Sequence, residues 1–376
     1  MALFGGYATG KVSRRLANAD GLGNTQRMFD LRKPLVFLLL GLVLALPALA
    51  GSPRVLRVLT WQGYADADVV KEFERRHGVR VEVTQIDSDT ALWQRLMASG
   101  GEDFDVFAVN TAELQRYIAA GIAQPINPAA IPNIARQLPR FRDVAAIPGL
   151  MHGGRLYGIP YTYAEMGLIY DRAQFARPPD SIAALWDPRL QGKVLAYNGG
   201  THNFSLARLS QGAATPFRIA PGGWGEAVQR LIELRRNVLA FYSQPDESVA
   251  LFRSHRVALL FANYGRQQLQ LLRAAGVDVG YVIPRDGTLA WLDCWVVARG
   301  AQERKLVDAW LDYMLEPQVS GLLVSRQGLG NTISEAPGER APSKLSWLEP
   351  VEDVGRREKL WARIISGDRV GRVLAP

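Results

Sequence analysis

Cysteine is almost missing from this sequence, because Cys294 is the only one among 376 residues. A chain with one cysteine cannot form an intrachain disulfide, so packing alone must hold the fold together. Histidine is scarce as well, and the four histidines are too widely separated for any of the usual metal-ligand spacings. They are His77, His152, His202 and His255. We therefore expect no metal site.

Motifs of the common enzyme classes are absent too. The sequence contains no Gly-x-Ser-x-Gly nucleophile motif, no P-loop and no glycine fingerprint for a dinucleotide. We therefore expect neither catalysis nor a cofactor. There is also no cluster of lysine and arginine with interleaved aromatic residues, and we expect no nucleic-acid partner.

The remaining composition is that of a folded protein, with 48% hydrophobic and 21% charged residues. The formal net charge of +8 comes partly from residues 1–50, which hold six basic and two acidic side chains. The rest of the chain has 38 basic and 34 acidic residues, so its charge is close to balanced. The length is sufficient for two lobes, each with a core of its own.

The first fifty residues have the pattern of a secretory signal. An apolar segment at residues 34–47 follows two basic residues and ends in small residues at 48–50, as a signal peptidase requires. Met28 could open this signal by itself. Gly51 stands where a lipoprotein would need its acylated cysteine, so we expect a soluble periplasmic protein. The alternative is an uncleaved membrane anchor, but the apolar segment is short for a span.

The segments that follow alternate between strand and helix patterns, which predicts a parallel sheet with helices on both faces. The first three predicted strands lie at residues 54–61, 79–86 and 104–110. Ligands of such sheets bind beyond the carboxyl ends of the strands. Trp61, Gln62 and Tyr64 lie at the end of the first strand, and Asn110 lies at the end of the third. These four residues are candidate ligand contacts.

A carboxylate stands in the middle of the segment LAWLDCWVV, residues 289–297. The segment reads as a strand covered on both faces, and an unpaired buried carboxylate there costs several kcal/mol. Asp293 therefore either pairs with a buried arginine or faces a cavity that holds a cationic partner. Cys294 points to the other face of the strand, so we expect it in the core.

Five segments occur in an order that resembles one known family. They are VLTWQGYADADVVKEFERRHGVRVEV, FDVFAVNTAELQRYIAAGIAQPI, RLYGIPYTYAEMGLIYD, ALWDPRLQGKV and GTLAWLDCWVV. The chain resembles the bacterial periplasmic spermidine/putrescine-binding proteins, within the family 1 extracellular solute-binding proteins. The resemblance implies an α/β fold of the type II periplasmic-binding-protein class, with mainly parallel sheets, in which two lobes close over a ligand. We expect residues 54–162 and 293–331 in lobe 1, and residues 163–292 and 332–376 in lobe 2.

The resemblance also implies a ligand site and a partner. In the family, aromatic residues enclose the methylene chain of the ligand, and an acidic residue pairs with its ammonium group. The matching positions are Trp61, Gln62, Tyr64, Asn110, Trp291 and Asp293. Tyr161, in an extended segment expected to cross between the lobes, is a further candidate. A monomer that delivers its ligand to the permease subunits of an ABC importer is the implied role.

The sequence departs from the family in the second lobe. Polyamine-binding members carry carboxylates where this chain has Gly199 and Thr201, and often a tryptophan where it has Asn263 or Tyr264. Glycine and threonine at the start of a helix present free backbone N–H groups, which suit an anion. The ligand could therefore be an amino-carboxylate or another zwitterionic or anionic molecule. We expect His202 and Asp246 to lie outside the pocket, as a polar loop residue and a helix-start acid.

Two other classes of protein remain as alternatives. A periplasmic sensor would bind the same kind of ligand and signal instead of transporting it. An enzyme on the same two-lobed fold is the other alternative, because a fold does not determine a function. The absent catalytic motifs count against the enzyme.

Overall fold

The computed structural model describes residues 54–335 and 344–376. The predicted signal peptide, its cleavage site and the alternative start at Met28 lie outside these ranges. Within them, no helix is both long and apolar enough to cross a membrane.

Eight strands form the larger of two main sheets, with a core order of β14-β7-β13-β3-β1-β2. Strand β1 runs parallel to β2 and β3, whereas β13 runs antiparallel to β3 and β7. The strands are β1 (Val55–Trp61), β2 (Arg80–Ile86), β3 (Val106–Asn110), β4 (Ala123–Gln124), β7 (Ile159–Glu165), β13 (Thr288–Ala298), β14 (Gly330–Asn331) and β15 (Leu345–Trp347). The helices around it are α2 (Ala67–His77), α3 (Asp89–Ala98), α4 (Thr111–Ala119), α5 (Pro139–Arg142), α10 (Arg304–Met314) and α11 (Pro317–Leu322).

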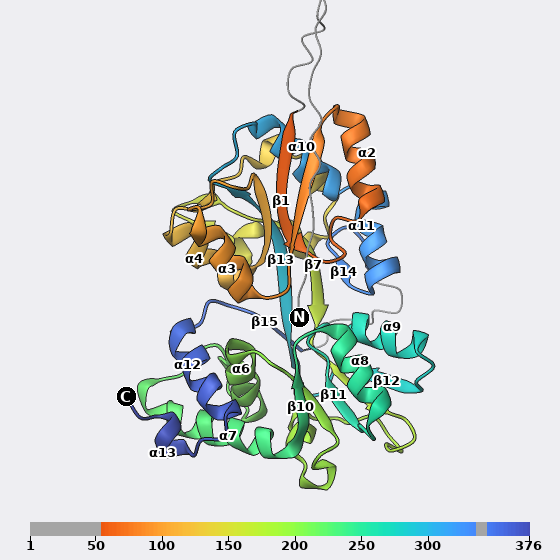
Figure 1. The fold of residues 1–376 in the computed structure, drawn as a ribbon, viewed down its shortest axis with the longest axis vertical. Coiled ribbons are helices and arrows are strands. Elements are labelled where there is room, and N and C mark those ends of the chain that lie inside the picture. The colour runs from red at the N-terminus through yellow and green to blue at the C-terminus, as the bar shows by residue number, and fades with distance from the viewer. Residues whose placement is uncertain (1–53, 336–343) are drawn as a thin grey trace, which may run out of the picture. The chain divides into compact units, whose positions relative to one another are not determined.

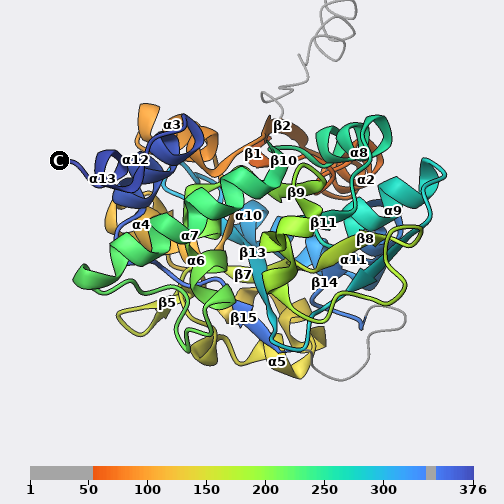
Figure 2. The ribbon, with the colours of Figure 1, turned by 90° about the horizontal axis from the view of Figure 1, so that it is seen from below.

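Five strands form the second sheet, in the order β10-β9-β11-β8-β12. They are β8 (Leu168–Asp171), β9 (Val194–Tyr197), β10 (Val238–Tyr242), β11 (Leu259–Phe261) and β12 (Val279–Val282). The helices of this lobe are α6 (Gly200–Ser210), α7 (Trp224–Asn237), α8 (Pro245–Ser254), α9 (Arg266–Ala274), α12 (Val354–Ile365) and α13 (Val370–Val373). Figure 2 shows α6 and α7 on one side of these strands and α8 and α9 on the other. A separate hairpin pairs β5 (Met151–His152) with β6 (Arg155–Leu156).

Strand β13 is the element that the sequence singled out, and all eleven of its residues are buried. It begins on the side of the small sheet and runs into the large one (Figure 1). Neighbouring strands β3 and β7 cover both of its edges. Cys294 is fully buried, as expected from its position one residue after Asp293.

Helix α2 shows how local sequence sets an element that flanks the site. Val69, Val70 and Phe73 recur at helical spacing and are buried against the core. The helix ends at Gly78, whose φ of 61° lies in the left-handed region that glycine adopts without strain. The buried face and the glycine cap therefore set where α2 packs and where it ends.

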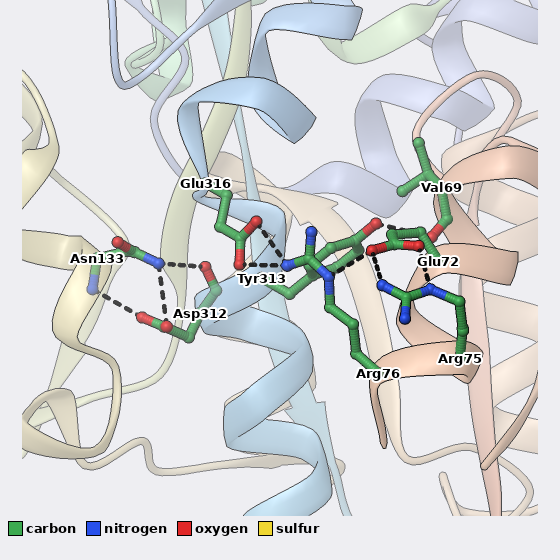
Figure 3. Close-up of polar contacts among 8 residues, drawn as sticks. All are labelled: Val69, Glu72, Arg75, Arg76, Asn133, Asp312, Tyr313 and Glu316. Atoms are coloured by element: carbon green, nitrogen blue, oxygen red, sulfur yellow. Dashed lines mark hydrogen bonds and ion pairs between the residues drawn. The ribbon is translucent and has the colours of Figure 1, made fainter. Parts of the chain in front are cut away.

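Polar contacts join α2 to the helices that follow β13 (Figure 3). The Tyr313 hydroxyl donates a hydrogen bond to the carbonyl of Val69 at 2.8 Å. Arg76 pairs with Glu72 at 2.7 Å and with Glu316 at 2.8 Å. The ion pairs are partly exposed and contribute little, whereas the tyrosine bond is buried. These contacts hold α10 beside α2 on lobe 1.

The chain crosses between the two lobes at three points in the described ranges. It leaves the large sheet after β7 and enters β8 at Leu168, so Met166 and Gly167 make the first crossing, a few residues beyond Tyr161, where it was expected. It returns between β12 and β13. It crosses again between β15, which pairs with β13 in the large sheet, and α12, which packs against α6. The full lobe boundaries stay a prediction.

The C-terminal helix α12 is tied to α6 by a buried arginine. The guanidinium of Arg357, which is fully buried, pairs with Glu352 at 2.9 Å and donates to Ser205 at 2.9 Å. It also donates to the carbonyls of Thr201 and Phe217, each at 3.1 Å. The first turn of α12 is therefore fixed against the N-terminus of α6.

Candidate functional site

A cavity of about 910 Å³ lies between the two sheets. Its lining from the large-sheet lobe includes Trp61, Gln62, Tyr64, Asp87, Asp89, Arg95, Asn110, Trp291, Asp293 and Gln327. Its lining from the small-sheet lobe includes Tyr197, His202, Gln244, Asp246, Asn263, Tyr264 and Gln267. Seven of the ten predicted contacts therefore face one space.

Asp293 lies on β13 and is 6% exposed. The Tyr64 hydroxyl donates a hydrogen bond to its Oδ2 at 2.7 Å. Burial raises the pKa of Asp293 to about 7, the hydrogen bond from Tyr64 opposes this rise, and the charge of Asp89 adds to it. No cation among the described residues forms an ion pair with it, so the alternative of a buried arginine partner has no support there.

Tyr161 lies behind Tyr64 and is not among the residues that line the cavity. Its hydroxyl donates to the backbone carbonyl of Tyr64 at 3.3 Å, and the two rings meet edge to face at 5.7 Å. Tyr161 is 1% exposed. It therefore supports the position of Tyr64, because an extended β7 directs that side chain into the core and not toward the cavity.

Two tryptophans contribute aromatic surface to the cavity. The indole N–H of Trp291 donates to the carbonyl of Asn263 at 2.8 Å, which joins β13 to the end of β11. Trp61 ends β1, and its indole nitrogen has no hydrogen-bond partner among the described residues. The amide oxygen of Asn263, which is 4% exposed, makes no hydrogen bond of good geometry there, although it interacts with the imidazole of His202. Polar atoms of both lobes are thus available to a ligand.

Asn110 has two roles at the end of β3. Its Oδ1 accepts a hydrogen bond from the backbone N–H of Glu113 at 3.1 Å and so caps α4. Its Nδ2 donates to Oδ1 of Asp89 at 3.1 Å. Asn110 therefore orients Asp89, a cavity residue that the sequence had not indicated.

Gly199 and Thr201, where an anion-binding end was expected, are not among the residues that line the cavity. The backbone N–H of Thr201 donates to Oε1 of Glu358 at 3.0 Å, and its hydroxyl lies 3.4 Å from the same atom. The N-terminus of α6 is therefore already occupied by a carboxylate of the chain. Glu358 comes from α12 and lies 157 residues from Thr201 in the sequence, so no local sequence pattern predicts this contact.

His202, Tyr197 and Tyr264 line the cavity although none of them was selected as a contact. Burial lowers the pKa of His202 to about 4, so its imidazole is neutral at pH 7. Tyr197 ends β9, so the strand-end rule that selected Trp61 could have selected it as well. His202 was expected in a loop, but α6 begins at Gly200 and therefore includes it. In the first turn of this helix the imidazole faces the cavity. Asp246 is both a helix-start acid of α8 and a cavity residue.

A smaller cavity of about 330 Å³ adjoins β7, α9 and β12. Its charged lining residues are Glu165, Arg266 and Arg273. It contains none of the ten predicted contacts. Over the two described ranges, no group of three or more His, Cys, Asp or Glu residues could hold a metal ion.

Known proteins of similar sequence and structure share one kind of activity. The putrescine-binding periplasmic protein PotF of Escherichia coli is 24% identical over 285 residues, covering 72% of this chain and 76% of that protein. The gamma-aminobutyric acid-binding protein of Pseudomonas aeruginosa is 25% identical over 355 residues, covering 86% and 95%. These relatives are solute-binding proteins and not enzymes.

The solved structure of the spermidine/putrescine transporter substrate-binding protein PotD from Streptococcus pneumoniae has a TM-score of 0.67. It is 19% identical and covers 83% of this chain and 98% of its own. The likeness confirms the expected two-lobed type II fold. Residues 68–341 match the family described as bacterial extracellular solute-binding protein. The chain belongs to the bacterial extracellular solute-binding protein family.

Proposed function

We propose that the cavity binds a small amine, and that the protein delivers it in the periplasm to the permease of an ABC importer. The observation that carries this proposal is the carboxylate of Asp293, which is buried in the cavity wall and has no ion-pair partner in the part of the chain that the structure describes. The named relatives bind putrescine, spermidine or gamma-aminobutyric acid, and each of these ligands carries an amino group.

An ammonium group fits the surroundings of Asp293. It would supply the counter-charge that the buried carboxylate lacks, and it would lower the pKa of Asp293 below about 7. Trp61 and Trp291 line the same cavity and offer aromatic surface to a cation or a methylene chain. The neutral His202 adds no opposing charge at pH 7.

Closure of the lobes over the ligand is part of the proposal. The side chain of Gln244, at the start of α8, donates to the carbonyl of Asp87 at 3.0 Å. Gln267 donates to Gln327 at 3.0 Å. Both bonds join one lobe to the other across the rim of the cavity. They support a closed arrangement that would release the ligand when they break.

A zwitterionic ligand is the second candidate, and Arg95 favours it. Arg95 is exposed on α3 and is the single arginine or lysine among the cavity residues of the described chain. It could receive a carboxylate at the cavity mouth. The four carboxylates in the lining favour the amine, because a carboxylate ligand would meet repulsion.

Titration calorimetry of the purified mature protein tests the function. The panel contains 1,4-diaminobutane, 1,5-diaminopentane, butylamine, 4-aminobutanoate and butanoate. We expect the amines to bind and butanoate not to bind, because it offers no cation to Asp293. Asp293→Asn should weaken amine binding at least about tenfold, while Asp278→Asn, an exposed acid outside the cavity, should not. Amine binding that survives Asp293→Asn unchanged would contradict the assignment.

A further inference from the structure

A second carboxylate in the cavity resembles Asp293 in lacking a cation. Asp89 is the first residue of α3 and lines the cavity. Its Oδ1 accepts the hydrogen bond from Asn110. No lysine, arginine or histidine of the described chain forms an ion pair with this carboxylate.

The arginine nearest to Asp89 is engaged elsewhere. Nη2 of Arg116 lies 2.7 Å from Oε2 of Glu113 and donates to the backbone carbonyl of Asp89 at 3.1 Å. Its guanidinium also stacks over the ring of Trp93 at 4.6 Å. Arg116 is thus paired with the carboxylate of Glu113, and it contacts Asp89 through the backbone carbonyl and not through the carboxylate. Burial raises the pKa of Asp89 to about 6, with Arg116 opposing and Glu358 adding to the rise.

Two tyrosines of the other lobe approach Asp89. The rings of Tyr197 and Tyr264 lie 5.9 Å apart at 89°, and both line the cavity. Burial raises the pKa of each hydroxyl, and the charge of Asp89 raises both further, so both stay neutral. Such a corner of neutral aromatic surface beside a carboxylate suits a cationic group.

The buried wall beside this corner adds a polar side chain to the cavity. Asn263 immediately precedes Tyr264, is more than nine-tenths buried and lines the cavity. Its amide oxygen makes no hydrogen bond of good geometry among the described residues, and the imidazole of His202 is the side chain that interacts with it. An N–H donor of a ligand would complete the hydrogen bonding of this buried acceptor.

We propose that Asp89, with Tyr197 and Tyr264, forms a second cation subsite that selects ligands with two cationic groups over monoamines. This inference rests on the proposed amine-binding function and assigns the second charge to lobe 1. In this arrangement one ammonium lies at Asp293 and the other lies between Asp89 and the tyrosines. Asp89 thus takes the place of the second-lobe carboxylates that the sequence lacks.

A purely local role for Asp89 predicts a different result. An acid in the first turn of a helix stabilises it through the helix dipole, whatever the cavity binds. Removing that charge would lower the melting temperature slightly. It would leave the preference for a dication over a monoamine unchanged.

The test compares 1,4-diaminobutane with butylamine by titration calorimetry. We expect the wild-type protein to bind the diamine at least about tenfold more tightly. Asp89→Asn should remove most of this preference by weakening diamine binding, with butylamine binding changed less than about twofold. Asp89→Glu should keep part of the preference, because it keeps the charge. Asp278→Asn is the matched control for net charge.

Three results would overturn the inference. Equal affinities of the wild-type protein for the two ligands would show that there is no second cation subsite. A preference that is unchanged in Asp89→Asn would place the second charge elsewhere. An equal loss for both ligands would make Asp89 a structural residue. Failure of both amines to bind the wild-type protein is a separate result, which would reject the proposed function itself.

Discussion

The hydroxyl of Tyr64 controls how readily Asp293 ionises. It donates to the carboxylate at 2.7 Å and opposes the effect of burial on the pKa of Asp293. In Tyr64→Phe the pKa of Asp293 should rise further above 7, so less carboxylate is present at pH 7. We expect amine affinity to fall about three- to tenfold at pH 7, and the loss to shrink at pH 9. Calorimetry at both pH values measures this, with Tyr157→Phe as a control outside the cavity.

Ionisation of Asp293 also couples binding to pH. Its pKa of about 7 lies above the ordinary value of 3.8, so part of the carboxyl is protonated at neutral pH. An amine binds the ionised form and displaces that proton. We expect affinity to rise from pH 6 to pH 8 and then level off, and binding at pH 7 to release protons. Titrations in buffers of different ionisation enthalpy measure the release, and no release at pH 7 would contradict the prediction.

The part of the candidate site that depends on local sequence patterns could be predicted. Trp61 and Asn110 were found because parallel strands present their carboxyl ends on one edge, and Asp293 because a buried carboxylate needs a partner. Glu358 could not be predicted, because only the fold brings α12 to the N-terminus of α6. Asp89 was not selected as a cavity residue for another reason. Its place at the start of a helix already explained it locally.

The junction of α12 with α6 depends on one buried cation. Arg357 is fully buried, and its removal leaves Glu352 and two backbone carbonyls without their donor. We expect Arg357→Met to lower the free energy of unfolding by about 3 kcal/mol. The neighbouring exposed Arg356, which stacks over Trp224 at 4.3 Å, is the matched control. Urea unfolding measures both variants, and an equal effect of the two would contradict this role for Arg357.

Stability of the whole protein should respond to pH in the direction opposite to amine binding. Burial raises the pKa of Asp293 and Glu113 to about 7 and that of Asp89 to about 6. The folded state therefore holds more protons than the unfolded state between about pH 4 and pH 7, so its stability falls as pH rises through this window. His202, whose pKa is lowered to about 4, opposes this trend below pH 6.5.

The contribution of Asp293 to the pH dependence of stability can be measured by comparing the wild type with Asp293→Asn. Asp293→Asn removes the raised carboxyl pKa and leaves His202 as it is, so the ligand-free variant should lose less stability than the wild type between pH 5 and pH 8. A saturating amine should restore the wild type at pH 8, because it supplies the missing counter-charge, and should leave the variant nearly unchanged. Thermal unfolding of both proteins at pH 5 and at pH 8, each with and without 1,4-diaminobutane, measures these effects. Parallel pH curves for the ligand-free wild type and variant would mean that Asp293 ionises normally, and the cavity would then need no cation to balance it.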